Sequence, residues 1–469
     1  MKALSIVVPT PEQLALAGQN RPGVEVIYGS AGSGKTTTAL LRLKSLCYMI
    51  QSRHRRENIS SAINILVLTF NRTLSGYIKN LVEHQLDTNI QTNIEINTFS
   101  GWAFNKLSSR PQIADTPSDI IFRLANNANI LSPQYVTKEV EYLLGRFLPE
   151  SINNYLVTER TGRGNIPRVD KELRIRILNE VVNPYKEKLS SSKKIDWNDL
   201  AIMMARNIPS LNYEIVIVDE TQDFSANQLR AIKYHLADYH TVTFVIDTIQ
   251  RIYARGFTWI EAGFDVRPER AHKLKINYRN TKQIANFAAS FLKDVSIEDD
   301  GSIPNLHEAV CEGMLPEVIC GLYNQQVTYA INFIKTSINL ENESIAFLHP
   351  LGGGYFSYLE TALENAKLKF KNITRESEWS NGDENIALST FHSVKGLEFD
   401  YVIILGLSNQ TTSHAEENID DQFFVLRKLL AMAIARAKKG VFLGYKPGEE
   451  SDLMQFLEEG TYRKLSYND

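Results

Sequence analysis

Residues 24–36 read VEVIYGSAGSGKT, and this stretch decides the fold of the first half of the chain. The apolar, β-branched run at 24–28 predicts a buried strand, and the small residues at 29–34 predict a tight loop. Apolar side chains at helical spacing through 35–50 predict a helix directly after the loop. The pattern G-x-x-x-x-G-K-[ST] therefore occurs in the strand–loop–helix context that a phosphate-binding loop requires.

This loop is expected to bind the phosphates of a nucleoside triphosphate. Its glycines allow consecutive backbone N–H groups to face the phosphates, and the N-terminus of the helix adds positive potential. Lys35 would reach the β- and γ-phosphates, and Thr36 would hold Mg²⁺. The expected nucleotide-binding residues of the loop are Gly29, Ser30, Ala31, Gly32, Ser33, Gly34, Lys35, Thr36 and Thr37.

A second acidic centre follows the apolar run EIVIV at 214–218. Carboxylates at the C-terminal end of a parallel strand lie where ligands bind in open α/β sheets. Asp219 is the expected carboxylate ligand of the metal, and Glu220 is the expected base for an attacking water. Together with the phosphate loop, these residues predict a nucleoside triphosphatase.

The composition excludes several other classes of protein. The chain has 469 residues with 51 basic and 54 acidic side chains, so it is no polycation, although a local basic groove remains compatible with nucleic-acid binding. Its three cysteines argue against a disulfide scaffold and a cysteine-rich metal site, and they fit a reducing cytoplasm. We find no apolar run near the ~20 residues of a membrane helix. Pro9 and Pro11 interrupt any signal-peptide core.

The order of apolar segments predicts two α/β units with parallel sheets in tandem. The first domain would comprise residues 1–110 and 205–270, with a helical subdomain inserted at 111–204, and the second domain would comprise 271–469. The strands expected in the first sheet are 24–28, 64–70, 94–98, 214–218 and 242–246. The strands expected in the second sheet are 273–276, 316–320, 344–348, 385–389, 401–405 and 440–445.

Further motifs accompany the phosphate loop and the DETQD sequence at 219–223. In chain order they are PTPEQ at 9–13, DTIQRIY at 247–253, LKINYR at 274–279, TFHSVKGLEF at 390–399 and AIARA at 433–437. This ordered series resembles the motif set of superfamily 1 helicases of the UvrD/Rep/PcrA type. The resemblance covers both core domains and implies two tandem RecA-like P-loop NTPase domains, with ATP and Mg²⁺ as cofactors.

The resemblance implies how the adenosine of ATP would be held. Gln13 would read the adenine edge, Tyr278 would stack on the adenine, and Glu398 would bind the ribose.

It also implies which residues would act on the γ-phosphate. Gln250 and Arg279 would contact it, and Arg436 would act as an arginine finger from the second domain. Phosphoryl transfer needs positioned charge around the γ-phosphate more than covalent chemistry. Since Lys35 belongs to the first domain, catalysis would depend on closing the cleft between the two domains.

Relatives of this type line a single-strand channel with groups at the ends of strands. Stacking of bases on aromatic side chains tolerates any sequence, as a motor that moves along a strand requires. Packing in the core is the alternative role for each aromatic residue. The candidates for nucleic-acid contact are Thr69, Phe70, Asn71, Thr98, Phe99, Trp102, Tyr253, Phe257, Trp259 and His392.

The interval between Arg279 and His392 is too short for the large accessory subdomain of the bigger relatives, so we expect a minimal two-domain motor. The leading hypothesis is an ATP-dependent translocase or helicase on single-stranded or tailed duplex DNA, with 3′→5′ polarity implied by the resemblance alone. One alternative is an ATP-binding regulatory subunit that controls a partner nuclease in anti-phage defence or DNA repair. The other is an RNA-directed helicase.

Overall fold

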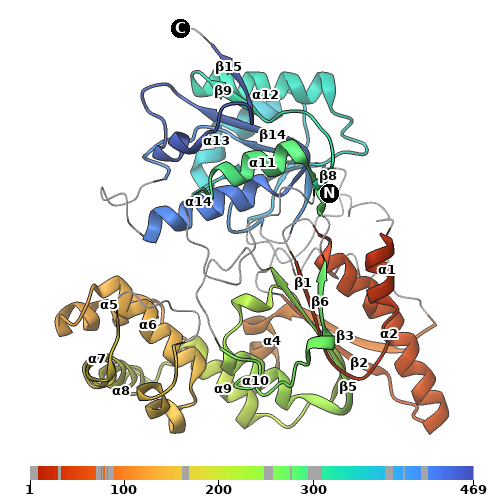
Figure 1. The fold of residues 1–469 in the computed structure, drawn as a ribbon, viewed down its shortest axis with the longest axis vertical. Helices are drawn as coiled ribbons and strands as arrows, with labels where there is room; N and C mark the ends of the chain where they lie inside the picture. Colours follow the sequence, from red (N-terminus) through yellow and green to blue (C-terminus); the bar gives the residue numbers. More distant parts are fainter. Residues whose placement is uncertain are drawn as a thin grey trace.

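The computed structural model describes most of the chain with its side chains (Figure 1). The described residues are 9–29, 33–69, 75, 78–79, 82, 89–160, 168–247, 257–274, 277–293, 309–374, 384–394, 397–412 and 421–467, with the backbone alone at 247, 277–279, 310, 421 and 422.

The first sheet is parallel throughout, with strand order β3-β2-β4-β5-β1-β6. Alternate residues of its strands face two different apolar layers: Ile65 and Val67 pack with the long helix α2 (Lys35–Glu57), whereas Leu66 and Leu68 pack on the opposite face. Burial on both faces explains the continuous apolar runs in the sequence. The strands are β1 (Gly23–Gly29), β2 (Ile63–Thr69), β3 (Thr92–Thr98), β4 (Tyr213–Val218), β5 (Leu236–Asp247) and β6 (Ala271–Leu274).

Strand β6 corrects one sequence-based prediction. Residues 273–276 were expected to open the second sheet, but β6 pairs with β1 in the first sheet, with Leu274 opposite Gly29. The first sheet thus continues beyond residue 270, where we had predicted the domain to end.

The inserted helical subdomain has an apolar core of its own, which includes Tyr155 and Tyr185. Helix α9 (Trp197–Asn207) lies within the predicted insertion, yet its buried Leu200 and Met204 join the core of the first domain. The insertion therefore ends before α9, earlier than residue 204. Its elements are α5 (Pro117–Ala128), α6 (Pro133–Arg146), η1 (Pro149–Leu156), α7 (Lys171–Arg176), η2 (Ile177–Val182) and α8 (Asn183–Ser191).

The face of the first sheet that carries Leu66 is covered by α4 (Phe99–Lys106), α9 and α10 (Ala226–Tyr234). The opposite face carries α2, and the short helix α1 (Pro11–Ala17) packs beside it.

The second sheet is also parallel, with order β11-β12-β10-β13-β14-β9-β15. Helices α12 (Tyr323–Ser337) and α13 (Ser357–Asn365) cover one face, and α11 (Lys282–Ser290) and α14 (Asp421–Ile434) cover the other. The small pair β7 (Asn277–Thr281) and β8 (Ala309–Cys311) lies beside this domain. The strands are β9 (Glu317–Cys320), β10 (Ile345–His349), β11 (Phe370–Asn372), β12 (Ile386–Thr390), β13 (Phe399–Ile404), β14 (Ala437–Tyr445) and β15 (Arg463–Ser466).

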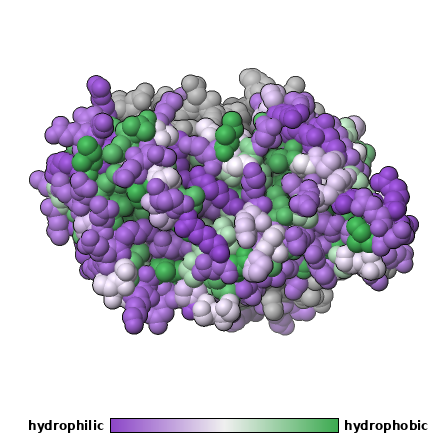
Figure 2. Space-filling model, turned by 90° about the horizontal axis from the view of Figure 1, so that it is seen from below, coloured by the Kyte–Doolittle hydropathy of each residue, from purple (hydrophilic) through white to green (hydrophobic). Residues whose placement is uncertain are grey.

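These two sheets confirm the predicted fold class, two parallel-sheet α/β domains in tandem. On the face of the molecule seen in Figure 2, hydrophilic residues predominate and hydrophobic ones form small separate groups. None of the helices in the described part of the chain is long and apolar enough to span a membrane.

Candidate nucleotide-binding site

The phosphate loop connects the end of β1 to the start of α2, and a glycine flanks it on each side. A Cβ at Gly29 would lie 2.7 Å from both the Leu274 carbonyl oxygen and Ser33 Oγ. Gly34 has a φ of +78°, and a Cβ there would lie 2.1 Å from Gln13 Nε2. The Leu274 backbone requires glycine at position 29, and the positive φ favours glycine at position 34, where the clash involves the flexible end of Gln13. The predicted ligands Ser30, Ala31 and Gly32 lie outside the described residues.

The expected metal ligands meet at this loop. The Thr36 hydroxyl donates a hydrogen bond to Asp219 Oδ2 at 2.9 Å, although the two residues lie in distant parts of the sequence. Burial and the neighbouring Glu220 raise the pKa of Asp219 to about 7. A bound divalent cation would reverse this shift by stabilising the carboxylate. A hydroxyl and a carboxylate oxygen at the phosphate loop fit Mg²⁺, which takes oxygen ligands.

Glu220, the second residue after β4, has a left-handed backbone conformation with φ of +53°. Such conformations are uncommon outside glycine and cluster at functional sites. The Gln222 side-chain amide donates a hydrogen bond to Glu220 Oε2, and the Glu220 backbone N–H donates to Asp219 Oδ1 at 3.0 Å. Gln222 was not assigned a role from the sequence. The DETQD motif alone could have suggested that Gln222 steadies the predicted base.

Gln13 contacts the loop from α1. Its Oε1 accepts a hydrogen bond from the Thr10 backbone N–H at 3.0 Å, and its Nε2 lies 3.5 Å from the Ser33 carbonyl oxygen. The other end of α1 is anchored by Arg42 of α2, whose Nη1 donates to the Leu16 carbonyl at 3.3 Å. Sequence reasoning missed Arg42, because only the fold reveals this contact.

On the second domain, the segments that carry three predicted ligands lie together. The Asn280 side-chain amide donates to the carbonyls of Ala435 and Ala437, at 3.0 and 2.6 Å, so β7 is tied to both neighbours of Arg436. The Arg436 carbonyl accepts a hydrogen bond from the Phe399 backbone N–H at 3.0 Å.

The side chains of these predicted ligands have different surroundings. Glu398, the residue before Phe399, forms an ion pair with Lys438 at 3.2 Å. Arg436 is buried. The side chains of Tyr278 and Arg279 lie outside the described part of the structure, as does all of Gln250.

The chain passes from the first domain to the second beside the phosphate loop. Leu274 ends β6 against Gly29, and β7 begins at Asn277, three residues further on. Because β6 runs parallel to β1, the chain leaves the first sheet at the edge where the phosphate loop begins. The segment that carries Arg279 therefore begins close to the loop.

Two of the residues predicted to contact nucleic acid belong instead to the core of the first domain. Trp102 is 0% exposed, and its indole N–H donates to the Tyr213 hydroxyl at 3.0 Å. Phe99 packs edge-on against Trp102 and Phe224. Buried side chains cannot stack on bases, so both predictions are corrected. The apolar face of α4 explains their position.

The other candidates for nucleic-acid contact divide into three groups. Thr69 is buried at the end of β2, and Thr98 caps α4 by accepting a hydrogen bond from the Gly101 backbone N–H. Phe257 and Trp259 are half-buried, and His392 is exposed. Phe70, Asn71 and Tyr253 lie outside the described residues.

A phosphate loop at the carboxyl edge of one parallel sheet, with a second parallel sheet in tandem, defines a P-loop NTPase with two RecA-like domains. Residues 10–257 match the UvrD/REP helicase N-terminal domain, and residues 322–447 match the UvrD-like helicase C-terminal domain. The chain belongs to the UvrD-like helicase family and is an ATP-hydrolysing enzyme of that family.

Several curated proteins are similar to this chain. A protein named "Probable DNA helicase" from Mycoplasma pneumoniae is 23% identical over 451 residues, 90% of this chain and 80% of that protein. A "Probable DNA helicase II homolog" from the same organism is 25% identical, over 67% of this chain and 46% of its own length. The ATP-dependent DNA helicase PcrA of Staphylococcus epidermidis is 25% identical, over 58% of this chain and 38% of its own length. The chain thus spans under half of the latter two proteins.

Proposed function

We propose that this protein is a single-stranded DNA translocase and helicase that couples ATP hydrolysis, with Mg²⁺, to movement along or unwinding of DNA. We assign a 3′→5′ polarity of movement along DNA because of the likeness to the family. The observation that carries the proposal is the place where the chain passes between the domains: Leu274, which ends β6 of the first sheet, lies against Gly29 of the phosphate loop, and β7 begins three residues later.

Hydrolysis would require both domains. Glu220 would accept a proton from the attacking water, with Gln222 holding its carboxylate. Arg279 and Arg436 would stabilise the charge on the transferred phosphoryl group only when the second domain closes over the loop. Mg²⁺ held by Thr36 and Asp219 would neutralise charge on the phosphates. Closure on ATP and opening after hydrolysis would alternate the grip on a bound strand.

Phe257, Trp259 and His392 remain the described candidates for strand contact. Stacking on an aromatic side chain is worth about 1–3 kcal/mol per base and does not depend on the base. Because the similar proteins are named DNA helicases, single-stranded DNA and tailed duplex DNA are the proposed substrates.

Steady-state ATPase measured with and without single-stranded DNA tests the motor, and RNA of the same sequence tests the polymer preference. We expect DNA to stimulate hydrolysis and Lys35→Ala to abolish it. The absence of stimulation by either polymer would refute the motor function.

Streptavidin displacement from each oligonucleotide end would assign the polarity of movement. Unwinding of a tailed duplex by the chain alone supports a helicase, whereas a requirement for a co-purified nuclease would support a regulatory subunit.

A further inference from the structure

A turn at residues 257–263 carries two candidate strand contacts, Phe257 and Trp259. Backbone hydrogen bonds form the turn, and one carboxylate binds its first residues in addition. Glu261 Oε2 accepts hydrogen bonds from the Thr258 backbone N–H at 2.7 Å and from the Thr258 hydroxyl at 3.1 Å. The Glu261 backbone N–H donates to the Thr258 hydroxyl oxygen at 3.3 Å. These bonds hold Thr258, which lies between the two aromatic residues in sequence.

The inserted subdomain binds the other oxygen of the Glu261 carboxylate. Arg146, the last residue of α6, donates from Nη2 and Nε to Glu261 Oε1 at 2.6 and 3.1 Å. Arg146 is 4% exposed, and it also donates to the Glu159 carbonyl at 2.7 Å and to the Tyr142 hydroxyl. Burial opposes ionisation of Glu261, but the hydrogen bonds from Thr258 and Arg146 outweigh it and hold the pKa of this carboxyl below its usual value.

Two side chains of α10 complete this contact from the first domain. Asn227 Nδ2 donates to the carbonyls of Leu144 and Phe147, at 2.9 and 3.1 Å, near the end of α6. Arg230 bridges the two elements, donating to the Arg146 carbonyl at 2.8 Å and to the Glu261 carbonyl at 2.9 Å. We call Arg146, Asn227, Arg230 and Glu261 the junction clamp.

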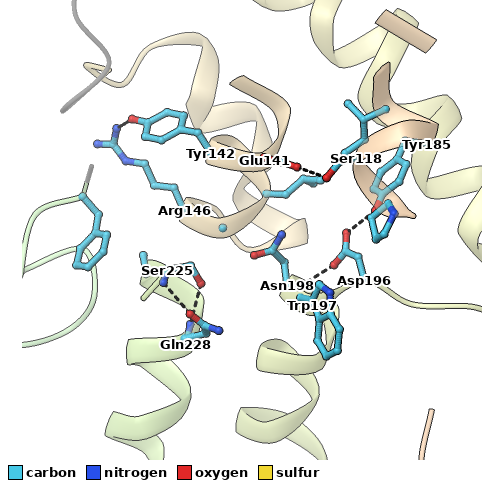
Figure 3. A pocket seen from close by; sticks show the side chains of 16 residues that line it. Ser118, Glu141, Tyr142, Arg146, Tyr185, Asp196, Trp197, Asn198, Ser225 and Gln228 are labelled. Carbon is cyan, nitrogen blue, oxygen red and sulfur yellow. Dashed lines mark hydrogen bonds between the residues drawn. The ribbon is translucent and has the colours of Figure 1, made fainter. Parts of the chain in front are cut away.

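Beside the junction clamp, the insertion and the first domain enclose a cavity of about 230 Å³ (Figure 3). Figure 3 shows Tyr142 and Arg146 of the insertion on one side, and Ser225, which caps α10, and Gln228 of α10 on the other. Phe257 also lines this cavity. Next to this cavity, the hydrogen bonds of the junction clamp join the insertion to the turn.

We propose that Arg146 and Glu261 are positioning residues through which the orientation of the inserted subdomain sets the geometry of the strand-contacting turn. The proposal rests on the proposed function, to which the roles of Phe257 and Trp259 as strand contacts belong. When the insertion moves, Arg146 displaces Glu261, and Thr258, bonded to the other oxygen of that carboxylate, moves with it. By reciprocity, a strand held by the turn favours one orientation of the insertion.

The test compares Arg146→Gln with Arg206→Ala. Arg206 of α9 also forms an ion pair with the insertion, through Glu150 of η1, but that pair does not touch the turn. Fluorescence anisotropy with a labelled oligothymidylate, at fixed salt and well below the unfolding temperature, measures strand affinity. Hydrogen exchange of the amides of residues 258–263 measures the order of the turn.

We expect Arg146→Gln to weaken oligothymidylate binding at least fivefold and to accelerate exchange in residues 258–263, with affinity for an ATP analogue unchanged. Arg206→Ala should leave all three readouts at wild-type values. Glu261→Gln should reproduce the loss, and combining it with Arg146→Gln should add little, since both remove one interaction.

Wild-type exchange in residues 258–263 of Arg146→Gln would overturn the proposal, whatever the affinity for DNA. So would exchange that rises equally throughout the first sheet, because that pattern marks general destabilisation. If the wild-type protein binds no oligothymidylate, the proposed function fails. Exchange then still decides whether Arg146 orders the turn.

Discussion

Gly34→Ala probes whether the contact between α1 and the phosphate loop positions Gln13 for adenine. The new Cβ would lie 2.1 Å from Gln13 Nε2, whereas real Cβ contacts essentially never fall below 3.0 Å, so the Gln13 amide must move by about 1 Å. A hydrogen bond lost in this way is worth about 0.5–1.5 kcal/mol. At about 1.4 kcal/mol per factor of ten, ATP affinity should fall roughly two- to twelvefold.

Gly353→Ala is the matched control. Gly353 also has a positive φ, +60°, but a Cβ there meets nothing within 4 Å. Both substitutions carry the left-handed backbone cost, about 1–2 kcal/mol for an alanine, which urea unfolding measures. Only Gly34→Ala should also weaken ATP binding.

Calorimetric titration with ATP and with GTP separates adenine recognition from phosphate binding. Gly34→Ala should weaken ATP binding more than GTP binding. In a Gln13→Ala background it should cost little further affinity, because the contact is already gone. ATP binding by the double variant at a tenth of the Gln13→Ala affinity would show that the backbone of the loop is responsible and would refute this reasoning.

Three further substitutions test the site and the core. Glu220→Gln should retain ATP binding but lose turnover, and full turnover in a coupled ATPase assay would remove Glu220 as the base. Asn280→Ala removes the amide that donates to the two carbonyls beside Arg436. The kcat should then fall about tenfold while KM for ATP changes little. An unchanged kcat would show that this contact does not position Arg436. Trp102→Ala should cost about 3–5 kcal/mol of unfolding free energy in urea, and an equal loss of strand affinity from the fully folded variant would contradict its assignment to the core.

The phosphate loop and the long buried strands could be predicted from the sequence because their signals are local. Gly29, Lys35 and Thr36 sit at fixed spacing between a strand and a helix, and backbone geometry accounts for that spacing. Continuous apolar runs likewise mark parallel strands that are buried on both faces.

The errors arose where distant segments decide the outcome. The short run at 273–276 is typical of a strand, but no local pattern shows which sheet a short strand joins. From the sequence alone, Trp102 could contact a nucleic-acid strand or pack in the protein core. Its hydrogen bond to Tyr213 shows that it packs in the core. The roles of Arg42 and Asn280 come from hydrogen bonds between distant parts of the chain, which leave no repeating signal in the sequence.

The short link from β6 to β7 limits how the two domains can separate. Three successive Cα–Cα steps of 3.8 Å join Leu274 to Asn277, so these residues stay within about 11 Å in any conformation. Large opening must therefore be a rotation about a pivot next to Gly29. This pivot lies close to where the γ-phosphate would bind. A small rotation there therefore produces a much larger displacement at the far ends of both domains in each cycle.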